Sequence, residues 1–198
     1  MKVLIIALPR TGSTTLMKAL GSILNLKTVN EPYYEHNPNL QTYPLKEKDS
    51  FIEKSMLNHL PSNIKESNIH FFSRYSKEFD KTILLGRRDL DAMTESFMYA
   101  LNTNGIWTKG WHDTYVIKDS FKLEEFKQHR KKVEKWMSNI KKLSEISSIP
   151  ITWYEDLYSG NKDLVLNLIK SWKLPLDYNY LKVFIDPVKK YRKSNTLV

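Results

Sequence analysis

The sequence contains no cysteine, and this absence excludes several kinds of chemistry. Disulfide bonds, thiolate metal sites and cysteine nucleophiles all need the missing thiol. A chain without disulfides is typical of a reducing compartment, so we expect a cytoplasmic protein. Histidine is scarce too, at 5 residues, and their scattered positions predict no metal site.

Long apolar runs are also missing. The run "VLIIAL" at residues 3–8 is far shorter than the roughly 20 residues that cross a bilayer, so we expect no integral membrane segment. No small-residue cleavage site follows it, which argues against a signal peptide. We therefore interpret residues 2–8 as a buried strand.

Acidic residues are outnumbered, 22 against 31 basic ones, and the net charge of +9 makes an anionic partner plausible. No zinc-finger spacing or RNA-binding signature is present. Many lysines lie in "KQHRKKVEKWMSNIKK" (127–142), where apolar residues repeat at helical spacing. This pattern favours a solvated helix face over a nucleic-acid surface, so we expect no nucleic-acid partner.

The order of the predicted elements is that of an α/β protein. We expect one domain over residues 1–198, with 189–198 as a flexible basic tail. Predicted strands cover 2–8, 69–72, 81–85 and 149–157. Predicted helices cover 13–24, 51–60, 89–101, 127–142 and 161–172. Strands alternating with helices indicate a central, mainly parallel sheet flanked by helices, with ligands at the carboxyl ends of its strands.

The stretch "ALPRTGSTTL" (7–16) directly after the first strand has the composition of an anion-binding turn. Gly12 lets the backbone approach an anion, the amides of a helix start bind it, and Arg10 adds a permanent charge. An ordinary Ser/Thr helix cap is the alternative. The stretch is not a Walker loop, because Ser13 stands where that motif has its lysine. Magnesium-dependent nucleotide hydrolysis is therefore disfavoured.

Three stretches together resemble the sulfotransferases that use 3′-phosphoadenosine 5′-phosphosulfate. "LPRTGSTTL" is similar to their 5′-phosphosulfate loop, "ILLGRRDLDAMTES" (83–96) to their 3′-phosphate motif, and "ITWYEDLYSGNKDLVLNLIKSWKLP" (151–175) to their Tyr-Glu-Asp-Leu strand and the helix behind it. The pattern is nearest to the carbohydrate and bacterial-type members. The resemblance implies a P-loop NTPase-like sulfotransferase fold. The implied reaction moves a sulfuryl group to a hydroxyl of a carbohydrate or glycolipid without a metal, releasing 3′-phosphoadenosine 5′-phosphate.

The resemblance also implies roles for individual residues. Arg10 stabilises the leaving group, and the 5′-phosphate lies on the loop residues Arg10, Thr11, Gly12, Ser13, Thr14 and Thr15. Arg88 and Ser96 hold the 3′-phosphate, with the adjacent Arg87 as a rival. Further implied contacts to the nucleotide come from Tyr154, near the adenine, and from Arg192 or Lys193 in the tail. Glu155 and Asp156 are expected to fix loops.

The acceptor side leaves alternatives open. The resemblance to carbohydrate members makes Glu31 the general base, with Glu35 and His36 as rivals on the same segment. Aromatic residues that can form platforms for a sugar ring are Tyr33, Tyr34, Trp107, Trp111 and Tyr115, with His36 as a further contact. Other interpretations are a P-loop kinase, a nucleic-acid-binding module and, because the chain is short, a relative that binds the nucleotide without catalysis.

Overall fold

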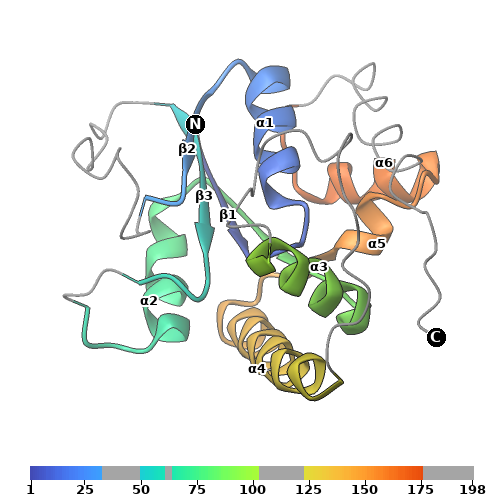
Figure 1. Cartoon of the computed structure of the whole chain (residues 1–198). Helices are drawn as coiled ribbons and strands as arrows, with labels where there is room; N and C mark the ends of the chain where they lie inside the picture. Colours follow the sequence, from blue (N-terminus) through green and yellow to red (C-terminus); the bar gives the residue numbers. More distant parts are fainter. Residues whose placement is uncertain (33–49, 61–63, 103–122, 176–198) are drawn as a thin grey trace.

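The structure, a computed structural model, describes residues 1–32, 50–60, 64–102 and 123–175. Within them a five-stranded sheet forms the centre of the molecule (Figure 1). Its strands are β1 (Lys2–Ala7), β2 (Lys27–Asn30), β3 (Phe51–Met56), β4 (Lys81–Gly86) and β5 (Ile151–Trp153). Their order is β2-β3-β1-β4-β5, and every neighbouring pair is parallel. The predicted α/β fold with a parallel sheet is confirmed.

The side chains of the central strand β1 show that both faces of the sheet are covered. Its residues are fully buried from Val3 to Ala7, as expected for a parallel strand between two helical layers. Alternate side chains enter two separate cores: Val3 and Ile5 on one face, Leu4 and Ile6 on the other.

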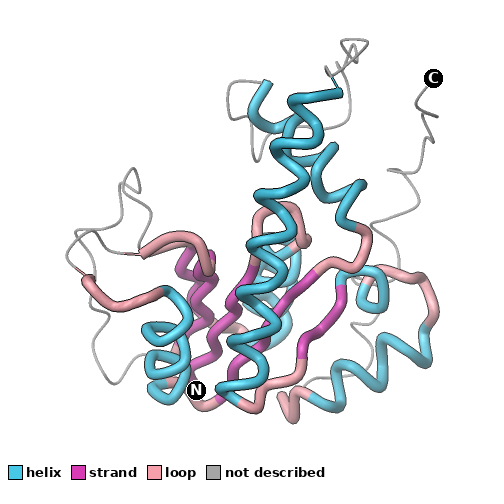
Figure 2. The backbone as a smooth tube through the Cα atoms, turned by 90° about the horizontal axis from the view of Figure 1, so that it is seen from below, coloured by secondary structure: helices cyan, strands magenta, loops and turns pink. Residues whose placement is uncertain are grey.

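Helices complete one layer on each face of the sheet (Figures 1 and 2). The core around Val3 contains side chains of α1 (Ser13–Leu24), α5 (Tyr154–Leu157) and α6 (Lys162–Ser171). The core around Leu4 contains side chains of α2 (Asn68–Tyr75), α3 (Leu90–Asn102) and α4 (Leu123–Ser147). A short 3-10 helix, Ser76–Glu78, links α2 toward β4. None of the helices in these described ranges is both long and apolar enough to cross a bilayer.

Two predicted elements were of the wrong type and a third had the wrong end, and each difference has a physical reason. The helix predicted at 51–60 is strand β3, whose charged residues hid its buried character: Glu53 accepts hydrogen bonds from Ser55 and Tyr75 inside the protein. The strand predicted at 69–72 lies in α2, which buries Phe71, Phe72 and Tyr75 on one helical face. The strand predicted at 149–157 stops after Trp153, because residues from Tyr154 onward form a helical turn.

Candidate functional site

The loop between β1 and α1 has an unusual backbone. Arg10 and Gly12 both lie in the left-handed region, with φ of 67° and 73°, and a residue with a side chain rarely adopts this conformation. Thr11 is fully buried and its hydroxyl donates to Leu8 O at 2.7 Å. The N-cap residue of α1 is Gly12, and no side-chain hydrogen bond caps this end of the helix. The alternative of an ordinary Ser/Thr cap is therefore wrong, and the amides at the start of α1 suit an anion.

Tyr158, which the sequence analysis missed, holds this loop in place. Its hydroxyl donates to Gly12 O at 2.9 Å, and its ring lies so close that a Cβ on residue 12 would come within 2.6 Å of it. Burial, with a smaller effect from Tyr154, raises the pKa of the Tyr158 phenol above its ordinary value. The phenol therefore stays a neutral donor, and the close approach explains why residue 12 is glycine.

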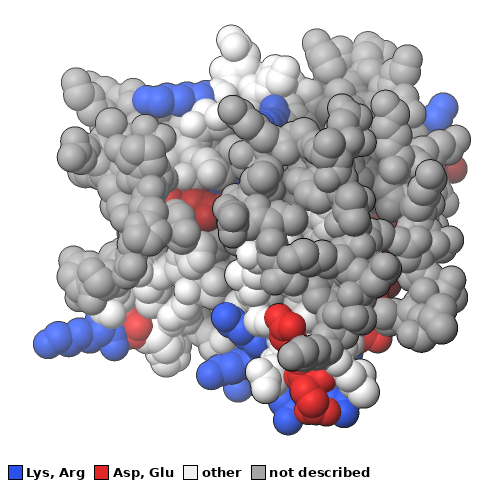
Figure 3. All heavy atoms as spheres, in the orientation of Figure 1, with Lys and Arg blue, Asp and Glu red and all other residues white. Residues whose placement is uncertain are grey.

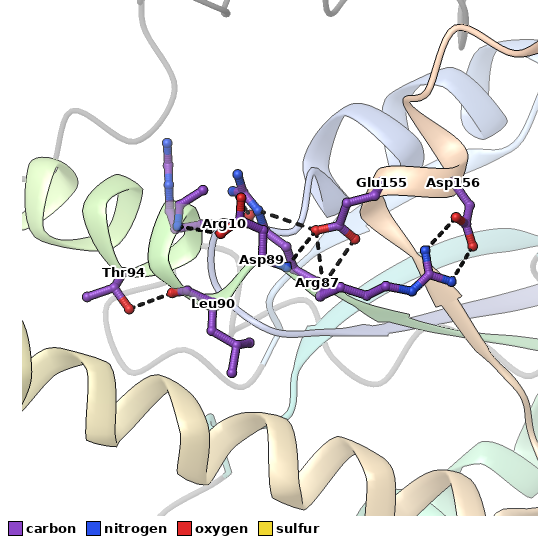
Figure 4. A network of polar contacts seen from close by, with 9 residues as sticks. Arg10, Arg87, Asp89, Leu90, Thr94, Glu155 and Asp156 are labelled. Carbon is purple, nitrogen blue, oxygen red and sulfur yellow. Dashed lines mark hydrogen bonds and ion pairs between the residues drawn. The ribbon is translucent and has the colours of Figure 1, made fainter. Parts of the chain in front are cut away.

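A first group of cationic side chains lies where β4 gives way to α3 (Figure 4). Arg10 Nε donates to Ser96 Oγ at 2.8 Å, and Arg87 donates to the backbone oxygen of Arg10 at 3.1 Å. The Arg87 guanidinium also stacks 4.5 Å over the Tyr154 ring. Its Nε is buried without a hydrogen-bond partner among the described residues, and the nearest carboxylate, Glu155, is 4.0 Å away. These contacts join the three stretches that the sequence analysis singled out.

Arg88, to which the resemblance gives the 3′-phosphate, points elsewhere. Its guanidinium makes two hydrogen bonds to Asp156, of 2.5 and 2.7 Å, and stacks 4.9 Å from the Trp153 ring. About half of this side chain is exposed, at 49%. Glu155 accepts the backbone N–H groups of Arg88 and Asp89 at 3.0 Å. Glu155 therefore fixes the loop after β4 as expected, whereas the Asp156 carboxylate binds the Arg88 side chain. Arg87 is the arginine that faces Arg10.

A second cationic group lies on the other side of the loop and was not foreseen. Lys54 of β3 is only 1% exposed, and its Nζ donates to Thr14 Oγ1 at 3.0 Å and to Glu31 Oε1 at 2.5 Å. Burial lowers the pKa of the lysine although the Glu31 carboxylate opposes this effect. His59 Nδ1 is 3.6 Å from the other Glu31 oxygen. The predicted base thus lies beside the first turn of α1.

Several of the predicted residues lie outside the described residues. They are Tyr33, Tyr34, Glu35, His36, Trp107, Trp111, Tyr115, Arg192 and Lys193. Among the described residues, no group of three or more histidines and carboxylates could hold a metal ion. On α4, some basic side chains pair with acidic ones, as in Lys127–Glu124 and Arg130–Glu134. Figure 3 shows both charges interspersed at the bottom of the view, where Figure 1 places α4.

The loop, the two cationic groups and Tyr154 together make a site with several donors for anions and an aromatic ring beside them. No family model matches the chain, and no curated protein matches it. The resemblance to sulfotransferases therefore stays a prediction from the three motifs.

Proposed function

We propose that the protein is a sulfotransferase that moves the sulfuryl group of 3′-phosphoadenosine 5′-phosphosulfate to a hydroxyl of a carbohydrate or glycolipid. The observation that carries the proposal is the presence of cationic groups on both sides of the β1–α1 loop. Lys54 comes from β3 and Arg87 follows β4, and these strands flank β1. Adjacent strands are about 4.8 Å apart, so the two strands lie about 10 Å apart. A nucleotide with phosphates at two ribose positions needs two such groups.

The 5′ end of the donor fits the start of α1. Its amides, the hydroxyls of Ser13 and Thr14, and the Lys54 ammonium offer hydrogen bonds and positive charge in one place. In sulfuryl transfer, charge grows on the phosphate oxygen that leaves. Donors fixed before the reaction stabilise this charge without reorganisation. Burial of Lys54 strengthens the effect, because a buried charge interacts through a lower effective dielectric constant.

The acceptor hydroxyl needs a base, and Glu31 is the carboxylate beside this end of the site. Glu31 contacts Lys54, which lies next to the loop. An acceptor oxygen bound at Glu31 would therefore lie close to a sulfuryl group bound at the loop. The acceptor oxygen forms a bond to sulfur, the bond from sulfur to the 5′-phosphate oxygen breaks, and Glu31 takes the acceptor proton. The products are a sulfate ester and 3′-phosphoadenosine 5′-phosphate.

The adenine fits beside Tyr154. The Tyr154 ring already stacks on Arg87 and lies 4.9 Å from the Tyr158 ring, so an aromatic surface adjoins the arginine group. A base can stack on such a surface while its ribose phosphate reaches the arginines.

A second candidate, a P-loop kinase, is favoured by one observation. Lys54 Nζ lies 3.0 Å from Thr14 Oγ1. The strand β3 therefore supplies, beside a hydroxyl of the loop, the lysine that the sequence of the loop lacks. A kinase would need magnesium and ATP, whereas the proposed reaction needs neither.

Incubation with donor labelled with ³⁵S and a panel of hydroxyl acceptors, in excess EDTA, tests the proposal. We expect label in a sulfate ester and stoichiometric release of the 3′,5′-bisphosphate. Magnesium-dependent turnover of ATP, without transfer from the labelled donor to any acceptor, would favour the kinase instead.

A further inference from the structure

One side of α1 lies against the strands β2 and β3, and Lys18 is on this side of the helix. Thr14 Oγ1 accepts a hydrogen bond from Lys54 of β3 at 3.0 Å, and a Cβ on Gly21 would lie 2.4 Å from Thr28 Cγ2 of β2. Lys18 comes four residues after Thr14 and three before Gly21, so it lies between them on the same side of the helix. Its side chain is exposed.

The predicted base, Glu31, lies where these two strands end. It directly follows β2, and its backbone N–H donates to Lys54 O at 2.7 Å. Its carboxylate forms an ion pair with Lys54 and lies 3.6 Å from His59 Nδ1. Burial is the main cause of the lowered pKa of Lys54, Glu31 opposes it, and the positive charge of Lys18 lowers this pKa further. Both the helix geometry and this charge effect therefore place the Lys18 ammonium near the Glu31–Lys54 pair.

The side chains around the base carry more positive than negative charge. Lys54 and Lys18 contribute two positive charges, Glu31 contributes one negative charge, and His59 adds a positive charge when it is protonated. No carboxylate within the described ranges forms an ion pair with Lys18. An exposed cation beside a binding site attracts anionic ligands, and a ligand that covers it strengthens the attraction by excluding water.

The donor nucleotide does not account for the charge of Lys18. An α-helix rises about 1.5 Å per residue, so Lys18 lies about 6 Å along α1 from Thr14, away from the amides at the start of the helix. In the proposed function the donor extends from these amides toward Arg87, which follows β4. Lys18 instead faces β2 and β3, on the other side of β1. It therefore lies on the acceptor side, with Glu31.

We propose that Lys18 binds an anionic group of the acceptor, so that the preferred acceptor is an acidic sugar with a carboxylate or sulfate group near the reacting hydroxyl. This proposal rests on the proposed function and narrows its class of acceptors. Glu31 takes the proton of the hydroxyl, and Lys18 holds the neighbouring anion. Lys18 is then a specificity-determining residue of the acceptor site.

Two matched pairs of sugars test the proposal: the octyl glycosides of glucuronate and glucose, and those of galacturonate and galactose. The members of each pair differ only in a carboxylate that replaces a hydroxymethyl group. With donor labelled with ³⁵S, the kcat/KM of the wild-type protein should be about tenfold higher, or more, for a uronate, the effect of one charge-assisted hydrogen bond. Lys18→Gln should abolish this preference and leave transfer to the neutral sugars unchanged within about threefold, as is usual for an exposed position. Lys18→Arg should retain the preference, because it retains the charge.

Binding provides a measurement that needs no turnover. Calorimetric titration of each sugar into protein saturated with 3′-phosphoadenosine 5′-phosphate should show the same preference in affinity, and Lys18→Gln should abolish it. Lys142→Gln is the matched control, because Lys142 is an exposed lysine of α4, which packs on the opposite face of the sheet from α1. The control should retain the preference.

Several results would overturn the assignment of Lys18 to the acceptor. They are equal losses for both members of a pair in Lys18→Gln, weaker binding of the bisphosphate by this variant, and wild-type protein that binds neither uronate. Wild-type protein that does not bind the bisphosphate and transfers label to no acceptor would instead overturn the proposed function.

Discussion

Two glycines with nearly the same backbone conformation allow the contact between Tyr158 and the β1–α1 loop to be tested through a difference in stability. Gly12 has a φ of +73° and Gly160 a φ of +76°, but only Gly12 has neighbours where a Cβ would be. A Cβ on Gly12 would lie 2.6 Å from Tyr158 Cε2, whereas nothing lies within 4 Å at Gly160. Alanine at both positions therefore has the same backbone penalty, and only one position adds a steric penalty.

The expected losses of unfolding free energy follow from the backbone penalty and the steric penalty. The left-handed conformation costs an alanine about 1–2 kcal/mol, so Gly160→Ala should lose about that much free energy of unfolding. Overpacking against a held side chain adds about 1–3 kcal/mol, so Gly12→Ala should lose about 2–5 kcal/mol. Tyr158 cannot move away freely, because its hydroxyl is bonded to Gly12 O and its ring is buried.

Urea unfolding of the two variants measures both losses, provided that the dependence on denaturant is unchanged. In a Tyr158→Ala background the steric penalty disappears, and the two alanine substitutions should then cost the same. Equal losses in the wild-type background would refute the contact between Tyr158 and the loop. Gly12→Ala should also weaken binding of the 3′,5′-bisphosphate, while Gly160→Ala should not.

Four further predictions concern the chemistry of the site. Glu31→Gln should lower turnover about 10²–10⁴-fold, the usual loss for a general base, and preserve bisphosphate affinity; normal turnover would place the base elsewhere. The affinity for the bisphosphate should be highest below the lowered pKa of Lys54. It should fall as pH rises through this pKa, which lies under the ordinary value of 10.5, because only the ammonium binds an anion. A wild-type titration that is flat from pH 7 to 10, or that matches Lys54→Gln, would contradict this. Arg87→Gln should weaken bisphosphate binding about ten- to hundredfold and Arg88→Gln about threefold or less; the reverse order in calorimetry would restore the assignment to Arg88 that the resemblance implies. Transfer activity should survive excess EDTA, and loss of activity that magnesium restores would exclude the proposed reaction.

The sequence predicted the parts of the fold in which one physical signal dominates. The apolar run of β1 is buried on both faces, and the glycine and hydroxyls behind it follow the strand directly into α1. The strand β4 was predicted from its short apolar run, and the helix α3 from apolar residues that repeat at helical spacing.

The parts that could not be predicted depend on tertiary contacts. Glu53 and Lys54 are charged, so β3 has a polar sequence, and their burial depends on partners that include Tyr75 and Glu31, which are distant in sequence. Tyr158 could have been suspected from its position four residues after Tyr154, one helical turn away. The resemblance favoured Arg88 over Arg87, but adjacent residues after a strand point in different directions, and the sequence does not show that Asp156 binds Arg88.

Calorimetric titration of the wild-type protein with 3′-phosphoadenosine 5′-phosphate, compared with ATP and magnesium, tests the proposed donor site most directly. The cationic groups on both sides of the loop predict saturable binding of one bisphosphate per chain, independent of EDTA and at least tenfold tighter than 5′-AMP. Tight binding of ATP only in the presence of magnesium, with no detectable heat from the bisphosphate, would contradict it.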